Sequence, residues 1–147
     1  MHRSSRGFTL LELLIVVAII AIGTVGVGLA LRDSGQTALE TQARALAAML
    51  ETARAQSRAT GVPVRWRPVP GGFVWEGLDN TGPDALPTSW KTAGIQAQAD
   101  TPVLLGPEPL IPAQSIRLWR EEQPQFRLTV ATDGVRPFDL SDRESAP

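Results

Sequence analysis

The sequence predicts an α+β fold in which a long N-terminal helix packs on a small antiparallel β head domain. Three features support this fold class. An almost uncharged apolar run opens the chain, apolar residues then recur at helical spacing as far as residue 60, and short alternating segments follow. A chain of 147 residues has room for one compact domain and an appendage.

The composition argues against nucleic-acid binding and against most kinds of catalytic site. The chain has 14 basic and 15 acidic residues, and without residues 1–7 it would have 12 and 15, a formal charge of −3. A protein that neutralises many phosphates normally carries a basic surplus. Cysteine is absent, and the single histidine, His2, precedes the apolar run. The rest of the chain therefore lacks an imidazole or thiolate for a catalytic triad or an ordinary zinc site.

The apolar run covers residues 8–31, and its one ionisable side chain is Glu12. At about 1.5 Å per residue, such a helix can cross a bilayer core of roughly 30 Å. Arg3 and Arg6 precede it, so the positive-inside tendency places residues 1–7 in the cytoplasm and the chain after Leu31 outside it. The simplest interpretation is a plain signal anchor.

Two details of this region indicate something more specific. Glu12 is an acid inside an apolar segment, where a charge at mid-bilayer costs on the order of 2.5–3.5 kcal/mol, so it requires a partner. Gly7 offers an unhindered peptide bond between the basic leader and the apolar run. The run Gly7-Phe8-Thr9-Leu10-Leu11-Glu12 resembles the type III signal of type IV prepilins and pseudopilins.

This resemblance implies a processing site and an assembly site. In that family, a prepilin peptidase cuts after the glycine, here between Gly7 and Phe8, and methylates the new amino terminus on Phe8. Glu12, with Thr9 beside it in the motif, is then assigned to assembly. Its carboxylate would pair with the amino group of a neighbouring subunit and set the register of a helical fibre. An ion pair in a low dielectric gives a physical reason to retain this acid.

Residues 32–60 are expected to continue the helix in amphipathic form. One face carries Leu39, Ala43, Leu46, Leu50 and Ala53, at spacings of four, three, four and three. The remaining surface carries Glu40, Arg44, Glu51, Arg54 and Arg58. We expect the apolar face to pack on the head, with a free coiled coil as the competing interpretation. Gly61-Val62-Pro63 is a typical helix end.

Residues 61–147 read as the β head domain. Val64 and Trp66, then Phe73 and Trp75, flank Pro70-Gly71-Gly72 and predict a hairpin. A strand is expected over Ser115 to Arg120, with Ile116 and Leu118 on one face. A second hairpin is expected from Phe126–Ala131 and Val135–Phe138 around Thr132-Asp133-Gly134, with Pro137 confining its last strand to an edge. Two long loops are expected over Leu78–Gly94 and Gly106–Ala113.

The order of these segments is similar to that of the H-class minor pseudopilins of type II secretion, whose relatives include the FimT-like minor pilins of type IV pili. The quoted segments are Ala53-Arg54-Ala55-Gln56-Ser57, Gly61-Val62-Pro63-Val64, Trp90, Phe126-Arg127-Leu128-Thr129-Val130 and Asp133-Gly134. The resemblance implies a single-pass inner-membrane protein with a periplasmic head. It also implies contacts with major and minor pseudopilins, prepilin peptidase and the inner-membrane assembly platform, without a cofactor.

Other candidate sites are weaker. Glu121, Glu122, Asp139 and Asp142 could suggest calcium, but they lack the spacing of a known loop, so a solvated surface is favoured. Gly71-Gly72 reads as a turn, not as a phosphate cradle. The residues Arg65, Trp66, Arg67 and Trp75 could suggest single-stranded DNA, yet alternation places the arginines on one face and Trp66 on the other. No nucleophile with a base can be assembled, so we expect neither an enzyme nor a metal site.

Overall fold

The computed structural model describes residues 9–141, except for the side chains of residues 23–34. The described chain contains one long helix, α1 (Leu10–Thr60), and seven strands. The strands are β1 (Arg65–Val69), β2 (Gly72–Glu76), β3 (Ile95–Gln98), β4 (Val103–Leu104), β5 (Gln114–Arg120), β6 (Gln123–Thr132) and β7 (Asp139–Ser141). The chain divides into two compact units, one that ends at Ser34 and one that begins at Gly35. The predicted α+β class is confirmed.

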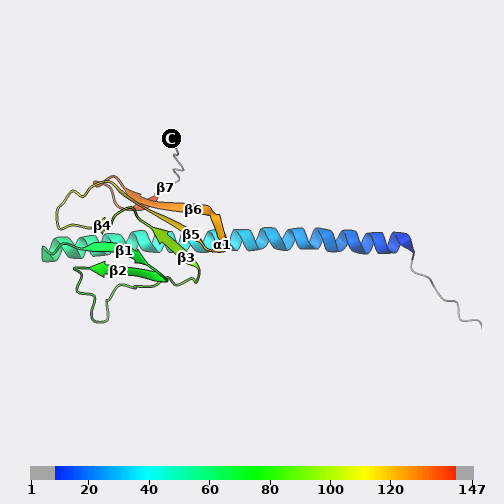
Figure 1. Ribbon diagram of the computed structural model, residues 1–147, viewed down its shortest axis with the longest axis horizontal. Coiled ribbons are helices and arrows are strands. Elements are labelled where there is room, and N and C mark those ends of the chain that lie inside the picture. Colours follow the sequence, from blue (N-terminus) through cyan, green and yellow to red (C-terminus); the bar gives the residue numbers. More distant parts are fainter. Residues whose placement is uncertain (1–8, 142–147) are drawn as a thin grey trace, which may run out of the picture. The chain divides into compact units, whose positions relative to one another are not determined.

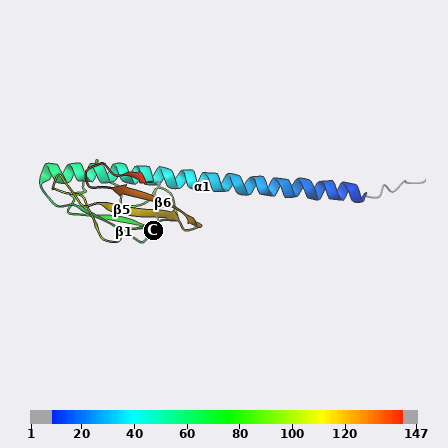
Figure 2. The same cartoon turned by 90° about the horizontal axis from the view of Figure 1, so that it is seen from above.

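In the second unit, α1 contributes one wall of the hydrophobic core. The predicted stripe of Leu39, Ala43, Leu46, Leu50 and Ala53 is buried, with no residue more than 2% exposed. These side chains join buried residues from both sheets in one cluster, and Figures 1 and 2 show the strands lying along this part of the helix. Burying each leucine contributes about 1.5–3 kcal/mol. The helix therefore packs on the head, as predicted, and is not a free coiled coil.

The helix ends where the sequence predicts. Thr60 is its last residue, and Gly61 follows with φ of 70°, a left-handed conformation that suits glycine at a helix C-terminus. The Gly61 N–H donates to the Ser57 carbonyl at 2.9 Å. One turn of helix is thereby closed before Pro63 redirects the chain toward β1.

The first sheet has the order β2-β1-β4 and contains the predicted first hairpin. β1 and β2 are antiparallel with Trp66 opposite Trp75, and Pro70-Gly71 forms the turn between them. Trp66 is fully buried, while Arg65 and Arg67 point to solvent on the other face. The predicted alternation along this strand is therefore confirmed.

The second sheet has the order β3-β5-β6-β7. The predicted strand over Ser115 to Arg120 is confirmed as β5, with Ile116 opposite Val130 and Leu118 opposite Leu128 on β6. All four side chains contribute to the core or pack against it. The short strands β3 and β4 were not predicted, nor was the tight turn at Glu121-Glu122 that joins β5 to β6.

The second predicted hairpin is correct in outline but wrong in its last strand. Val135–Phe138 is not a strand, and the edge strand is β7, which pairs Leu140 with Val130. Side chains of the turn form hydrogen bonds with the backbone N–H and C=O groups that a strand here would need for pairing. The Asp133 carboxylate accepts the Val135 and Arg136 N–H groups at 2.9 and 2.8 Å, and the Thr132 hydroxyl donates to the Arg136 carbonyl at 2.6 Å. Pairing can therefore begin only after Phe138.

Candidate functional site

Both residues assigned to assembly lie at the start of α1, Thr9 directly before the helix and Glu12 in its first turn. The Glu12 N–H donates to the Thr9 hydroxyl at 3.3 Å and to the Thr9 carbonyl at 3.0 Å, and the Leu13 N–H reaches the same carbonyl at 3.2 Å. Thr9 is therefore the N-cap, and Glu12 is the third helical residue, the spacing of a capping box. A carboxylate in the first turn also interacts favourably with the helix dipole. Gly7 and Phe8 lie outside the described residues.

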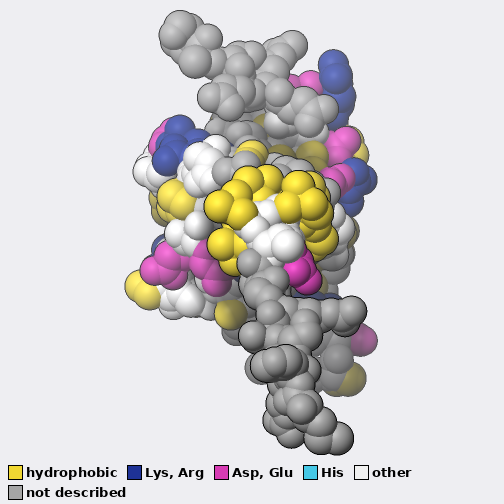
Figure 3. Space-filling model, turned by 90° about the vertical axis from the view of Figure 1, so that its right-hand side faces the viewer, with side chains coloured by type: hydrophobic (Ala, Val, Ile, Leu, Met, Phe, Trp, Pro, Cys, Tyr) yellow, Lys and Arg dark blue, Asp and Glu magenta, His cyan; other side chains and the backbone are white. Residues whose placement is uncertain are grey.

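The helix surface that follows this turn is apolar and exposed. The exposed fraction is 80% for Leu10 and 74% for Ile22, and all ten large hydrophobic residues in this stretch are at least 43% exposed. Figure 3, which faces the start of α1, shows hydrophobic side chains gathered around the helix. Soluble monomers rarely expose a contiguous apolar surface of this extent, so it indicates an interaction surface.

Within the part of the chain that the structure describes, none of the helical sequence is both long and apolar enough to cross a membrane. The membrane-spanning helix over residues 8–31 therefore stays a prediction.

A second polar site lies inside the head, at Arg54. The sequence placed this residue on the exposed side of the helix, and that prediction is wrong, because Arg54 is 3% exposed. Its Nη2 donates at 3.1 Å to two carbonyls, those of Pro109 and Gly134, and its Nη1 lies 3.7 Å from the Glu51 carboxylate. Glu51 in turn accepts the Phe138 N–H at 2.9 Å. Arg54 and Glu51, which lie on one turn of α1, therefore hold the loop before β5 and the loop between β6 and β7 in place.

The loop after β6 has its own electrostatic feature at Asp133. Hydrogen bonds from the Arg136 N–H and then the Val135 N–H stabilise its charged form and hold the pKa of this carboxyl below its usual value. The Arg136 guanidinium lies 3.2 Å from the same carboxylate. Asp133 is therefore a structural acid that fixes the turn between β6 and β7.

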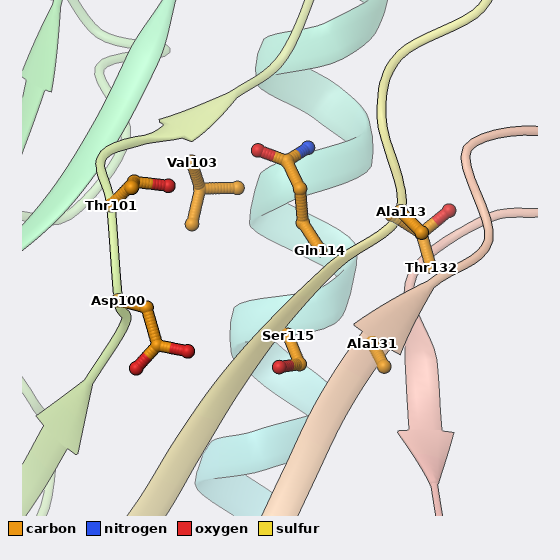
Figure 4. A pocket seen from close by; sticks show the side chains of 8 residues that line it. All are labelled: Asp100, Thr101, Val103, Ala113, Gln114, Ser115, Ala131 and Thr132. Carbon is orange, nitrogen blue, oxygen red and sulfur yellow. The ribbon is translucent and has the colours of Figure 1, made fainter.

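A surface cavity of about 370 Å³ lies where the loop before β4 approaches β5 and β6 (Figure 4). Its lining is Asp100, Thr101, Val103, Ala113, Gln114, Ser115, Ala131 and Thr132. The Gln114 amide exchanges hydrogen bonds of 2.6 and 2.9 Å with the Leu104 backbone, and Asp100 pairs with Arg117 at 2.9 Å. These eight residues include no histidine, cysteine or lysine. Its hydroxyl groups belong to Thr101, Ser115 and Thr132, and its one carboxylate, that of Asp100, is held in the ion pair with Arg117.

The residues weighed for single-stranded DNA do not form a stacking surface. Trp66 is fully buried and Trp75 is 8% exposed, while Phe73 packs against both rings. The Trp75 indole N–H donates to the Pro87 carbonyl at 2.8 Å, and Arg67 pairs with Glu76 at 2.6 Å. Both tryptophans belong to the core, as the alternation along β1 predicted.

The acids weighed for calcium are not brought together. Glu121 and Glu122 form the turn before β6, and Glu122 pairs with Arg120 at 2.7 Å. Asp139 lies opposite Ala131, eight residues along β6 from Gln123, which at about 3.3 Å per residue is roughly 26 Å away. Asp142 lies outside the described residues. The three described acids therefore cannot share one cation.

Comparison with known proteins identifies the N-terminal segment. Residues 2–28 match the family model described as the prokaryotic N-terminal methylation motif, the type IV pilin-like prepilin signal. The match covers about a fifth of the chain and indicates a type IV pilin-like protein with a membrane anchor. The proteins that carry this motif have structural roles. No curated protein and no solved structure matched this chain.

Proposed function

We propose that this chain is a minor pseudopilin of a type II secretion system, a structural subunit of the periplasmic pseudopilus that drives protein export. The observation that carries the proposal is the methylation motif over residues 2–28, which includes the exposed apolar helix surface of residues 10–22. The amphipathic continuation of the helix is packed into a β head domain. A processed signal, an apolar stalk and a folded head are the parts that a fibre subunit requires.

Maturation comes first in this proposal. The chain enters the inner membrane with residues 1–7 in the cytoplasm, prepilin peptidase cuts between Gly7 and Phe8, and the new amino group of Phe8 is methylated. The apolar segment of residues 8–31 then retains the subunit in the membrane as a single-pass protein with a periplasmic head. The inner-membrane assembly platform receives it there.

Registration in the fibre is the proposed role of Glu12. Thr9 caps the helix through the Glu12 N–H, so the first turn is already ordered where the carboxylate leaves it. In an apolar fibre core, an unpaired carboxylate would be strongly unfavourable, and the amino terminus of a neighbouring subunit would neutralise it. This pair forms in one axial register, which is how it would order major and minor pseudopilins as they join.

One observation favours the alternative, a FimT-like minor pilin that takes part in motility or DNA uptake. On the outer face of the second sheet, the Arg127 guanidinium lies 5.6 Å from the centre of the Trp119 ring, and Arg117 is on the same face. An aromatic ring between arginines can contact single-stranded nucleic acid. The acidic balance of the chain and the Arg117–Asp100 pair weaken this alternative.

The experiment that tests the proposal compares a strain lacking this chain with the same strain complemented by it. Secreted proteins in the medium, pilus-driven motility and DNA uptake are scored in parallel. Loss of secreted proteins with normal motility and uptake supports the pseudopilin. Intact secretion with lost motility or uptake would overturn it in favour of the type IV pilus.

A further inference from the structure

Two aromatic side chains of the described head lie outside its core, and both are at the same end of the second sheet. Trp119 and Phe126 are half-buried, and neither belongs to the hydrophobic cluster or packs against it, unlike the other aromatic residues of residues 35–141. Trp119 is the last but one residue of β5 and pairs with Arg127. Phe126 lies in Pro124–Phe126, which has no partner on β5 and bulges from β6. We call Trp119, Phe126 and Arg127 the aromatic rim.

The turn beside the aromatic rim contacts α1 at Gly35, the first residue of the second unit (Figure 1). A Cβ atom added to Gly35 would lie 2.8 Å from the Gln123 Oε1 and 2.9 Å from the Arg120 Nη1, so these side chains cover the glycine directly. Arg120 follows Trp119 along β5, and one strand residue advances by about 3.3 Å. The aromatic rim therefore lies close to the level at which the helix enters the head.

The length of chain between Leu31 and Gly35 limits how far this end of the head can be from the membrane. In the proposed function the apolar segment ends at Leu31, four residues before Gly35. Four residues span about 6 Å in a helix and at most about 14 Å in an extended chain. The headgroup layer adds roughly 5–8 Å on each side of the hydrocarbon core. The Gly35 end of the head therefore lies within reach of the lipid headgroups.

We propose that the aromatic rim rests in the headgroup layer of the membrane before the subunit joins a fibre. This inference rests on the proposed function and adds a second contact with the bilayer, made by the head. Tryptophan is enriched at membrane interfaces because its ring is apolar and its N–H is polar. The Arg127 guanidinium, 5.6 Å from the centre of the Trp119 ring, binds a lipid phosphate, while the rings of Trp119 and Phe126 contact the apolar side of the headgroup layer.

The charges around the aromatic rim suit a zwitterionic lipid surface better than a nucleic acid. Glu121 and Glu122 are exposed in the adjoining turn, and Glu122 pairs with Arg120 at 2.7 Å. Together with Arg127, these residues carry two positive and two negative charges. A nucleic acid presents phosphates alone, which the two glutamates would repel. A zwitterionic phospholipid presents a phosphate for Arg127 and an amine for Glu121.

The test uses the full chain, reconstituted without other proteins in vesicles of phosphatidylcholine that is brominated near the headgroup. Bromine quenches tryptophan fluorescence only at short range, so we expect these vesicles to quench the chain more strongly than unbrominated vesicles do. Trp119→Phe should remove most of this quenching, whereas Trp90→Phe, the matched change at another half-buried tryptophan, should leave it. Lipid brominated at the ends of its acyl chains should quench less. Quenching that survives Trp119→Phe, or no quenching of the wild type, would overturn the proposal.

A second pair of variants tests the contact between Arg127 and lipid phosphate. Arg127→Gln should lose part of the headgroup quenching, while Arg136→Gln, an exposed arginine beyond the other end of β6, should retain all of it. Equal quenching of the two variants would contradict the phosphate contact. Quenching of Trp119 by a single-stranded oligonucleotide, in place of quenching by brominated lipid, would overturn the proposal and assign the aromatic rim to nucleic acid.

Flotation of the same vesicles separates this inference from the proposed function. A chain that does not float with the vesicles contradicts the membrane anchor on which the proposed function depends. A chain that floats while brominated lipid leaves Trp119 unquenched contradicts the headgroup contact alone.

Discussion

The two parts of α1 differ in the solvent exposure of their apolar side chains. Between Leu10 and Ile22 every large hydrophobic residue is exposed, whereas Leu39, Leu46 and Leu50 are at most 2% exposed. Apart from Glu12, the first segment carries exposed apolar side chains, which indicates a surface for interaction with other molecules. The second is apolar on one face, which the head's own sheets cover. The end of the helix therefore serves folding, and we propose that its start serves assembly.

Among substitutions that test this comparison, we expect the largest effect from those at Glu12, on co-purification with partner subunits. Glu12→Ala should be processed normally but lose most co-purification with partner pilin-like subunits, because the ion pair that sets the register is gone. Glu12→Gln separates two roles, since glutamine also serves in a capping box but carries no charge. We expect the glutamine variant to fail as the alanine variant does. Normal assembly of Glu12→Gln would show that helix capping, and not charge, is what Glu12 provides.

Stability should respond only in the second part of the helix. Leu50→Ala should lower the free energy of unfolding of the head by about 2–5 kcal/mol, because it leaves a cavity between α1 and the sheets. Leu14→Ala, the matched change on the exposed stretch, should alter it by less than about 0.5 kcal/mol. Denaturant unfolding of the full chain in detergent measures both, since all four tryptophans lie in the head. Equal losses from the two variants would contradict the division.

Arg54 is expected to give an intermediate effect. Arg54→Lys keeps the charge but cannot donate to both carbonyls in the same planar geometry, so stability should fall by about 1–3 kcal/mol. Arg58→Lys, an exposed residue one turn further along, is the matched control and should be neutral. The readout is the same tryptophan-detected unfolding. A neutral Arg54→Lys would mean that the two loops hold their positions without the guanidinium.

The smallest effect is a pH dependence at Asp133. Because its folded pKa lies below the usual 3.8, its contribution to stability is present above about pH 4 and is lost as pH falls through the folded value. Asp133→Asn should lower the melting temperature slightly at neutral pH, and the difference from wild type should shrink below pH 4. A difference that is unchanged down to pH 2 would exclude the charge of Asp133 as its source.

Sequence patterns predicted the features whose cause is local. The helical stripe, the Pro70-Gly71 turn and the burial of Trp66 follow from periodicity and turn chemistry, and the processing motif is a contiguous run. Arg54 was misplaced because a charge on a helix normally marks solvent, and its carbonyl partners lie 55 and 80 residues away. The last strand lies at Asp139–Ser141 and not at the predicted Val135–Phe138, because the side chains of Thr132 and Asp133 bind backbone groups of Arg136 that strand pairing would require.

The most direct test of the central claim is the intact mass of the chain in the membrane fraction, measured for the wild type and for Gly7→Ala. The account predicts that the wild type begins at Phe8 and carries one methyl group on its amino terminus, and that Gly7→Ala retains residues 1–7. A wild-type chain that begins at Met1, or a Gly7→Ala chain that still begins at Phe8, would contradict it.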